Sequence, residues 1–187
     1  CAKIDSFSNL CNSLTSKQIM ATLNGLFCEL DAELLKFPRI TKIKTSAESY
    51  LCAAGIFDSD GNIEDATSEL ANFASQIKDV ISVLELKHDS EIHMKIGIFT
   101  GGPIICGVIG KDKPTFEIIG KGVNVAEQLM AKSLPDKIHI SQSTANLLEK
   151  MNWKMNEFSG NAQIPGIENQ KTYIIDWLIL FCYIFVC

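Results

Sequence analysis

The stretch KPTFEIIGKGVNVAEQLM carries polar residues whose types and spacing could hold a ligand. Glu117 is the one carboxylate in an apolar, strand-like run, which then breaks at Gly120 and Gly122. Asn124 and Gln128 stand four residues apart, so a helix that begins here would present both on one side. The stretch therefore predicts a strand, a turn and a helix that form an elbow with a carboxylate and two amides.

Hydrophobic periodicity predicts the elements that must position this elbow. A capping box at Thr15–Gln18 predicts the start of the first long helix. The first half of the chain reads strand 1–7, that helix, hairpin strands 40–45 and 50–57, helix 66–84 and strand 92–98. The second half adds strands 104–109 and 116–119, the elbow helix, strand 137–140, helix 143–151, and strand pieces near Trp153 and Thr172. The order of the first half, β-α-β-β-α-β, predicts an α+β fold with a ferredoxin-like core.

Composition limits the classes of function. The 187 residues, 47% of them hydrophobic, suit one globular domain. The net charge is −5 and the Lys and Arg residues are dispersed, so we do not expect a surface that binds nucleic acid. The seven cysteines show no zinc spacing and mostly stand in apolar stretches, so we expect reduced, buried thiols and a cytosolic compartment.

The two ends of the sequence suggest a piece of a longer protein. The chain begins at Cys1 without a methionine and enters a strand-like pattern at once, so we expect a domain at 1–176 that begins inside its first strand. Residues 177–187, WLILFCYIFVC, form an apolar tail that is shorter than the roughly 20 residues of a membrane-spanning helix. A truncated membrane segment is the favoured interpretation, with an interface strand or a sequence-end artefact as alternatives.

Three longer segments resemble the catalytic domains of class III adenylyl and guanylyl cyclases: KIKTSAESYLCAAGIF, MKIGIFTGGPIICGVIGKDKPTFEIIGKGVNVAEQ and KIHISQSTANLL. The resemblance runs from Cys1 to about Ile175 and implies a ferredoxin-like core with additional C-terminal strands and a helix. In that family two domains pair head to tail, with the active sites between them. The 3′-hydroxyl of ATP or GTP attacks its own α-phosphate and releases pyrophosphate, with two Mg²⁺ or Mn²⁺ ions bound.

The resemblance assigns the purine side of such a site to the elbow and to a hairpin strand. Lys44 stands where adenylyl cyclases typically carry lysine and guanylyl cyclases glutamate, and Glu117 stands where the adenylyl type carries aspartate. Together they favour adenine, although a simple ion pair across neighbouring strands is an equal alternative. Asn124 matches the residue that orients the ribose, or else caps the helix. Gln128 replaces the arginine that stabilises the α-phosphate.

The metal side departs from the family pattern. Lys3 falls where the first metal-binding aspartate belongs, and Asp5, two residues along the same strand face, is its nearest replacement. Glu48 corresponds to the second aspartate, although it could equally be a solvated turn residue, and Ala47 replaces the glycine before it. Glu48 and Asp5 are therefore the candidate ligands for Mg²⁺ or Mn²⁺.

The resemblance also implies two phosphate contacts. Backbone N–H groups around Ser6, Phe7 and Ser8 would form the phosphate loop after the first strand. A family lysine that reaches the polyphosphate from the C-terminal hairpin falls on Ile167 here, and Lys171 would need a shift of register to replace it.

These observations lead to two functional hypotheses. The first is a class III cyclase domain in intracellular signalling that converts ATP, in preference to GTP, with weak or partner-dependent activity. The alternative is an inactive cyclase-like domain that binds nucleotide or regulates a partner cyclase domain. Either would work as a homodimer or as a heterodimer with another cyclase domain, in a cytoplasmic domain that the parent protein could attach to a membrane.

Overall fold

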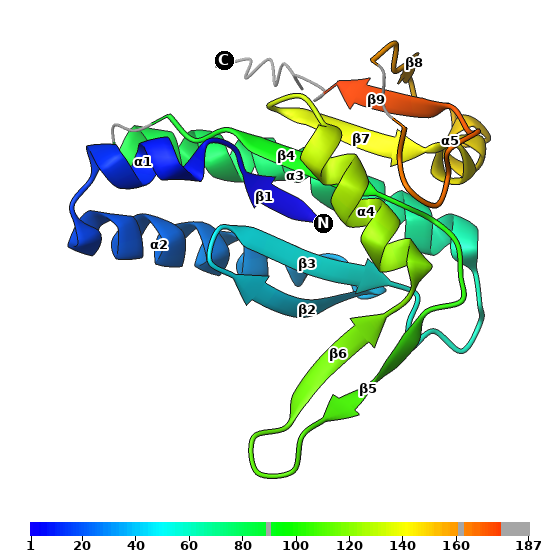
Figure 1. The fold of residues 1–187 in the computed structure, drawn as a ribbon, viewed down its shortest axis with the longest axis horizontal. Helices are drawn as coiled ribbons and strands as arrows, with labels where there is room; N and C mark the ends of the chain where they lie inside the picture. The colour runs from blue at the N-terminus through cyan, green and yellow to red at the C-terminus, as the bar shows by residue number, and fades with distance from the viewer. Residues whose placement is uncertain (89–90, 161–162, 177–187) are drawn as a thin grey trace, which may run out of the picture.

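The structure is a computed structural model that describes residues 1–88, 91–160 and 163–176. Within these residues a seven-stranded sheet carries helices on both faces, and a two-stranded hairpin extends away from it (Figure 1). The strands are β1 (Ala2–Ile4), β2 (Ile40–Ser46), β3 (Ser49–Ala54), β4 (Met94–Ile98), β5 (Ile105–Ile109), β6 (Thr115–Ile119), β7 (Lys137–Ser141), β8 (Asn156–Glu157) and β9 (Thr172–Asp176). The helices are α1 (Phe7–Ser13), α2 (Ser16–Leu34), α3 (Ile63–His88), α4 (Lys121–Lys132) and α5 (Gln142–Glu149).

The strand order confirms the predicted ferredoxin-like core. The sheet runs β2-β3-β1-β4-β7-β9-β8, and β1 lies antiparallel between β3 and β4. The helices α2 and α3 connect the strands of this core, as the β-α-β-β-α-β order requires. The additional C-terminal elements extend the sheet because β7 pairs parallel with β4 and β9 pairs antiparallel with β7.

The helices divide between the two faces of the sheet. Apolar side chains of α2, α3 and α5 pack in one core with the strands, and they include Leu26, Phe73 and Leu148. On the other face α4 crosses β4 and β7 (Figure 1). Gly97 permits this close crossing, since a Cβ atom there would lie 2.2 Å from the Ala126 carbonyl oxygen. As a result, α4 packs closely against β4 and β7.

The beginning of the chain differs from the sequence prediction. The first strand ends at Ile4 instead of continuing to Phe7, and α1 follows as a helix that was not predicted. Ser6 precedes this helix in the left-handed conformation with φ 52°. Phe7 and Leu10 of α1 pack against the main core. A seven-residue helix contains too few turns for its apolar period to be recognised in a sequence. The capping box at Thr15, by contrast, is present as predicted.

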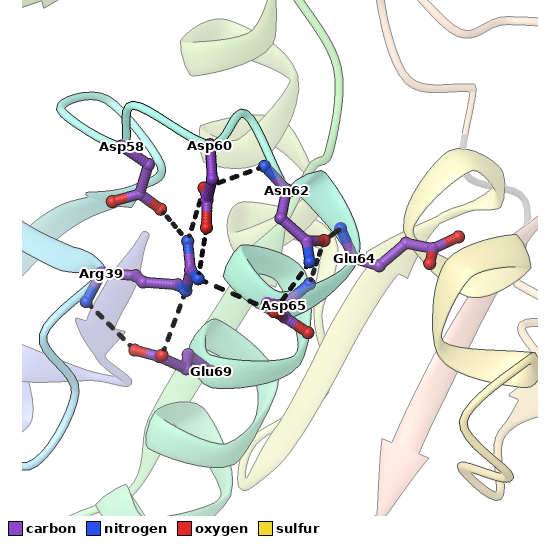
Figure 2. A network of polar contacts seen from close by, with 7 residues as sticks. All are labelled: Arg39, Asp58, Asp60, Asn62, Glu64, Asp65 and Glu69. Atoms are coloured by element: carbon purple, nitrogen blue, oxygen red, sulfur yellow. Dashed lines mark hydrogen bonds and ion pairs between the residues drawn. The ribbon is translucent and has the colours of Figure 1, made fainter.

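A network of charged side chains fixes the loop before α3 (Figure 2). The Arg39 guanidinium lies 2.7 Å from carboxylate oxygens of Asp58 and of Asp60. The backbone N–H of Arg39 donates to the Glu69 carboxylate at 3.1 Å. Asn62 then caps α3, because its side-chain oxygen accepts hydrogen bonds from two backbone N–H groups of the first turn. Arg39 holds the pKa of Asp60 at about 2, chiefly through their hydrogen bonds. This network ties the start of β2 to the start of α3.

Cysteine exposure and the C-terminal tail complete the comparison with the sequence. The described cysteines are free, as expected, but Cys28 and Cys106 are exposed and the other three are partly exposed, so the prediction of buried thiols was wrong. Cys182, Cys187 and the whole predicted tail at 177–187 lie outside the described residues. In the part of the chain that is described, no helix has the length and apolar content needed to span a bilayer.

Candidate functional site

Lys44 and Glu117 form an ion pair between β2 and β6. The Lys44 Nζ atom lies 2.8 Å from the Glu117 Oε2 atom, and the two side chains are 47% and 27% exposed. A register shift in β2 between Lys42 and Lys44 accompanies this placement. Without nucleotide, Lys44 and Glu117 therefore form the ion pair that was the alternative interpretation of these two residues. Because both groups remain partly open to solvent, the same pair could also present a donor and an acceptor to a base.

A small apolar cluster packs β6 and the start of α4 against β2 and β3. Its members include Ile43, Phe116, Ile118 and Val123, together with residues of β3. Each is a chain neighbour of one of the predicted site residues: Ile43 precedes Lys44, Phe116 and Ile118 flank Glu117, and Val123 precedes Asn124. The cluster thus joins β2 and β3 to β6 and to the start of α4, the segments that carry Lys44, Glu117 and Asn124.

Two amide side chains of α4, those of Asn124 and Gln128, are exposed to solvent. Gly120 is the residue that caps α4, so the interpretation of Asn124 as the helix cap was wrong. A Cβ atom at Gly120 would lie 2.9 Å from the Pro103 carbonyl oxygen, and this close approach explains the glycine. Asn124 and Gln128 are both exposed, and their side chains make no hydrogen bond to any residue that the structure describes. They are available to a ligand on the side of α4 that they share.

Lys3 binds the residue expected to hold a metal ion. The Lys3 Nζ atom lies 2.6 Å from the Glu48 Oε1 atom, with the side chains 43% and 24% exposed. The backbone fixes this contact, because the Ile4 N–H donates to the Glu48 carbonyl oxygen at 2.9 Å. Ala47, in the turn before Glu48, takes a left-handed conformation with φ 47°, which glycine would adopt with less strain.

Asp5 is bound by a second lysine that the sequence did not indicate. The Lys95 Nζ atom lies 2.8 Å from the Asp5 Oδ1 atom, and the hydrogen bond from Lys95 holds the pKa of Asp5 below its usual value. Both predicted metal ligands, Glu48 and Asp5, are therefore paired with ammonium groups. Among residues 1–88, 91–160 and 163–176, no three His, Cys, Asp or Glu side chains come together as a metal site would require. The residues present do not fit Mg²⁺ or Mn²⁺.

The predicted phosphate contacts lie in two parts of the fold, the start of α1 and the C-terminal segment that contains Ile167 and Lys171. Phe7 and Ser8 form the first turn of α1, where backbone N–H groups have no acceptor within the helix, and Ser6 precedes them. Ile167 is buried and packs against Val125 and Leu129 of α4, so this position serves the core. Lys171 pairs with an exposed glutamate at 2.8 Å. The C-terminal hairpin therefore brings no free cation to the elbow from these two positions.

Comparisons with known proteins agree with the fold. The family model of the adenylate and guanylate cyclase catalytic domain matches residues 1–177. The chain is 27% identical over 175 residues to atrial natriuretic peptide receptor 2 of Rattus norvegicus, covering 92% of this chain and 16% of the receptor. It is 31% identical over 199 residues to guanylate cyclase beta of Plasmodium falciparum, covering 92% of this chain and 6% of that protein. The chain thus spans a small part of these relatives.

Solved structures give the same result. The guanylate cyclase domain of RhGC from Catenaria anguillulae, in complex with GTP, matches with a TM-score of 0.80 at 27% identity, covering 93% of this chain and 92% of that one. The adenylyl cyclase CyaB from P. aeruginosa matches with a TM-score of 0.75 at 21% identity, covering 94% and 91%, which shows a shared fold. The family match over nearly the whole chain establishes that this chain belongs to the class III adenylyl and guanylyl cyclase catalytic domains.

Proposed function

We propose that this domain binds a purine nucleotide at the elbow and takes part in nucleotide cyclisation only together with a partner domain. The observation that carries the proposal is the 2.8 Å contact between Lys44 and Glu117, whose strands one apolar cluster joins to the start of α4. The exposed Asn124 completes a group of one donor, one acceptor and one amide that a nucleoside could contact. The cyclic 3′,5′-nucleotide and pyrophosphate would be the products.

Adenine is the base that this pair favours. The Lys44 ammonium would donate to a ring nitrogen, and the Glu117 carboxylate would accept from the exocyclic amino group. Guanine presents a carbonyl oxygen where adenine has that amino group, and this oxygen would face a carboxylate. The relatives named above include guanylate cyclases, so GTP is the competing substrate. We therefore expect ATP to bind more tightly than GTP.

A low rate of cyclisation is expected from the residues at the positions that would contact the phosphates. Gln128 could donate a neutral hydrogen bond to the α-phosphate, but it brings no positive charge. The loss of one such electrostatic contact typically costs on the order of 10²- to 10³-fold in rate. Ile167 is part of the core, so no lysine from that position reaches the polyphosphate. We therefore expect this chain alone to bind nucleotide but to cyclise it very slowly.

Pairing with another domain is supported by the β5–β6 hairpin. The hairpin extends away from the sheet (Figure 1), and Ile105 and Val108 on it are 70% and 67% exposed. Exposed apolar side chains on a projecting hairpin are typical of an interface. A homodimer or a heterodimer with a second cyclase domain would cover them. By analogy with the relative named as a receptor, we place this domain on the cytoplasmic side of a longer protein, in intracellular signalling.

The test is a product assay with matched variants. Purified domain is incubated with ATP or GTP and Mn²⁺, alone and mixed with a second cyclase domain that retains both metal-binding aspartates, and the cyclic nucleotide is measured by mass spectrometry. We expect product only in the mixture, and more of it with Gln128→Arg, because the arginine restores a charge at the α-phosphate. Gln142→Arg, on α5, is the control for an added charge elsewhere. Absence of product in every mixture, with ATP binding intact, would favour the alternative of a non-catalytic domain that binds nucleotide or regulates its partner.

A further inference from the structure

The metal side of the domain contains a closed set of four charges. Lys3 and Lys95 face each other as direct partners across β1 and β4. Like charges in that position repel, unless each has an opposite charge to bind. Glu48 supplies one at 2.6 Å from Lys3, and Asp5 supplies the other at 2.8 Å from Lys95. The four side chains therefore depend on one another, and their summed charge is zero.

A divalent ion would have to break this set. If it took Glu48, Lys3 would lose its carboxylate while remaining opposite Lys95, and the ion would lie beside an ammonium group. Hard cations such as Mg²⁺ and Mn²⁺ need several oxygen ligands and gain most from carboxylates that carry free charge. Neither Glu48 nor Asp5 offers such charge here. The lysines thus oppose a metal both by occupying its ligands and by direct repulsion.

We propose that the Lys3 ammonium is a built-in substitute for a divalent ion, so that this domain brings no metal site to a nucleotide groove. Glu48 then serves to orient Lys3, with Lys95 and Asp5 as the supporting pair. One consequence rests on the proposed function: a second copy of this chain would bring the same lysines. The partner that completes a catalytic groove must therefore be a cyclase domain of different sequence, with free carboxylates at the corresponding positions.

The experiment measures Mn²⁺ binding directly, without nucleotide, so its outcome is independent of whether ATP binds. Amide NMR spectra of the domain are recorded during a Mn²⁺ titration, because the paramagnetic ion broadens the signals of residues close to its site. The variants are Lys3→Asp, which replaces the ammonium with a ligand, and Lys3→Asp combined with Glu48→Gln, which removes the neighbouring ligand. Lys171→Asp is the matched control, since Lys171 also pairs with one glutamate at 2.8 Å. The same spectra report whether each variant is folded.

In the wild-type domain we expect no preferential broadening around Lys3 and Glu48. Lys3→Asp should gain local broadening there, with Mn²⁺ binding at least about tenfold tighter than in the wild type. The double variant and Lys171→Asp should not gain it. The proposal is overturned if Mn²⁺ broadens this region equally in the wild type and in Lys3→Asp. If Lys3→Asp does not fold, Lys3→Asn adds an oxygen ligand without a second negative charge, and equal broadening in that variant and the wild type has the same meaning.

Discussion

Lys44→Glu is the perturbation that most directly probes the base-binding side of the site. In the wild type, the Lys44 Nζ atom lies 2.8 Å from the Glu117 carboxylate, and the side chains of Lys44 and Glu117 are 47% and 27% exposed. The substitution replaces an attractive pair with two carboxylates and removes the donor expected to contact a ring nitrogen. Stability and nucleotide affinity should therefore both fall, by amounts that can be estimated separately.

The stability loss should be small. Two unit charges about 4 Å apart interact by about 1 kcal/mol in water and by about 4 kcal/mol at a dielectric constant of 20. The exposure of Lys44 and Glu117 places them near the lower figure, so we expect the free energy of unfolding to fall by about 1 kcal/mol. A hydrogen bond to a charged group contributes roughly 1.5–3 kcal/mol. The affinity for ATP should accordingly weaken by roughly 10- to 100-fold.

The assay is calorimetric titration of ATP and of GTP into the wild type and the variants. Lys42→Glu is the matched control, because Lys42 lies on the same strand and pairs with Asp31 at 2.6 Å. It should lose similar stability and keep its affinity for ATP. GTP binding should fall less than ATP binding in Lys44→Glu. Unchanged ATP affinity in Lys44→Glu, or an equal loss in both variants, would refute the role of Lys44 in base recognition.

Three further predictions concern stability. Ala47→Gly should raise the free energy of unfolding by about 0.5–1 kcal/mol because it relieves the left-handed residue in the β2–β3 turn; a lower thermal midpoint would contradict this. Gly97→Ala should cost about 1–3 kcal/mol, since the new Cβ atom would meet the Ala126 carbonyl oxygen, and an unchanged denaturation midpoint would show that α4 can move. Arg39 lowers the pKa of Asp60 from 3.8 to about 2, so the pair stabilises the fold above about pH 4 and is lost as the pH falls towards 2. Asp60→Asn should therefore flatten the pH dependence of unfolding in that range, and identical curves would exclude the pair as its cause.

Most of the fold could be predicted because its signals are local. Alternating apolar residues identified the hairpin strands, and the capping box at Thr15 located the start of α2. The short helix α1 was missed, since Phe7 and Leu10 alone do not define a period and a left-handed Ser6 leaves no signal in its residue type. Element order was thus accessible from the sequence, whereas short irregular segments were not.

The site was only partly accessible from sequence for a different reason. The family resemblance indicated that Lys3 stands where a metal-binding aspartate belongs, and residue types indicated that Lys44 and Glu117 could form an ion pair. The contact between Lys3 and Glu48 depends on a turn fixed by backbone hydrogen bonds, and the involvement of Lys95 depends on strand register. Register is a property of the folded sheet, and a sequence does not show which residues of distant strands face each other.

The central claim is that one purine nucleotide binds where β2, β6 and the start of α4 meet. Amide chemical shifts measured while ATP is added to the wild-type domain test it most directly. The largest changes should fall at Lys44, at Glu117 and between Asn124 and Gln128, and they should weaken when GTP replaces ATP. Saturable binding whose shift changes lie elsewhere, or no change at these residues at any ATP concentration, would contradict the account.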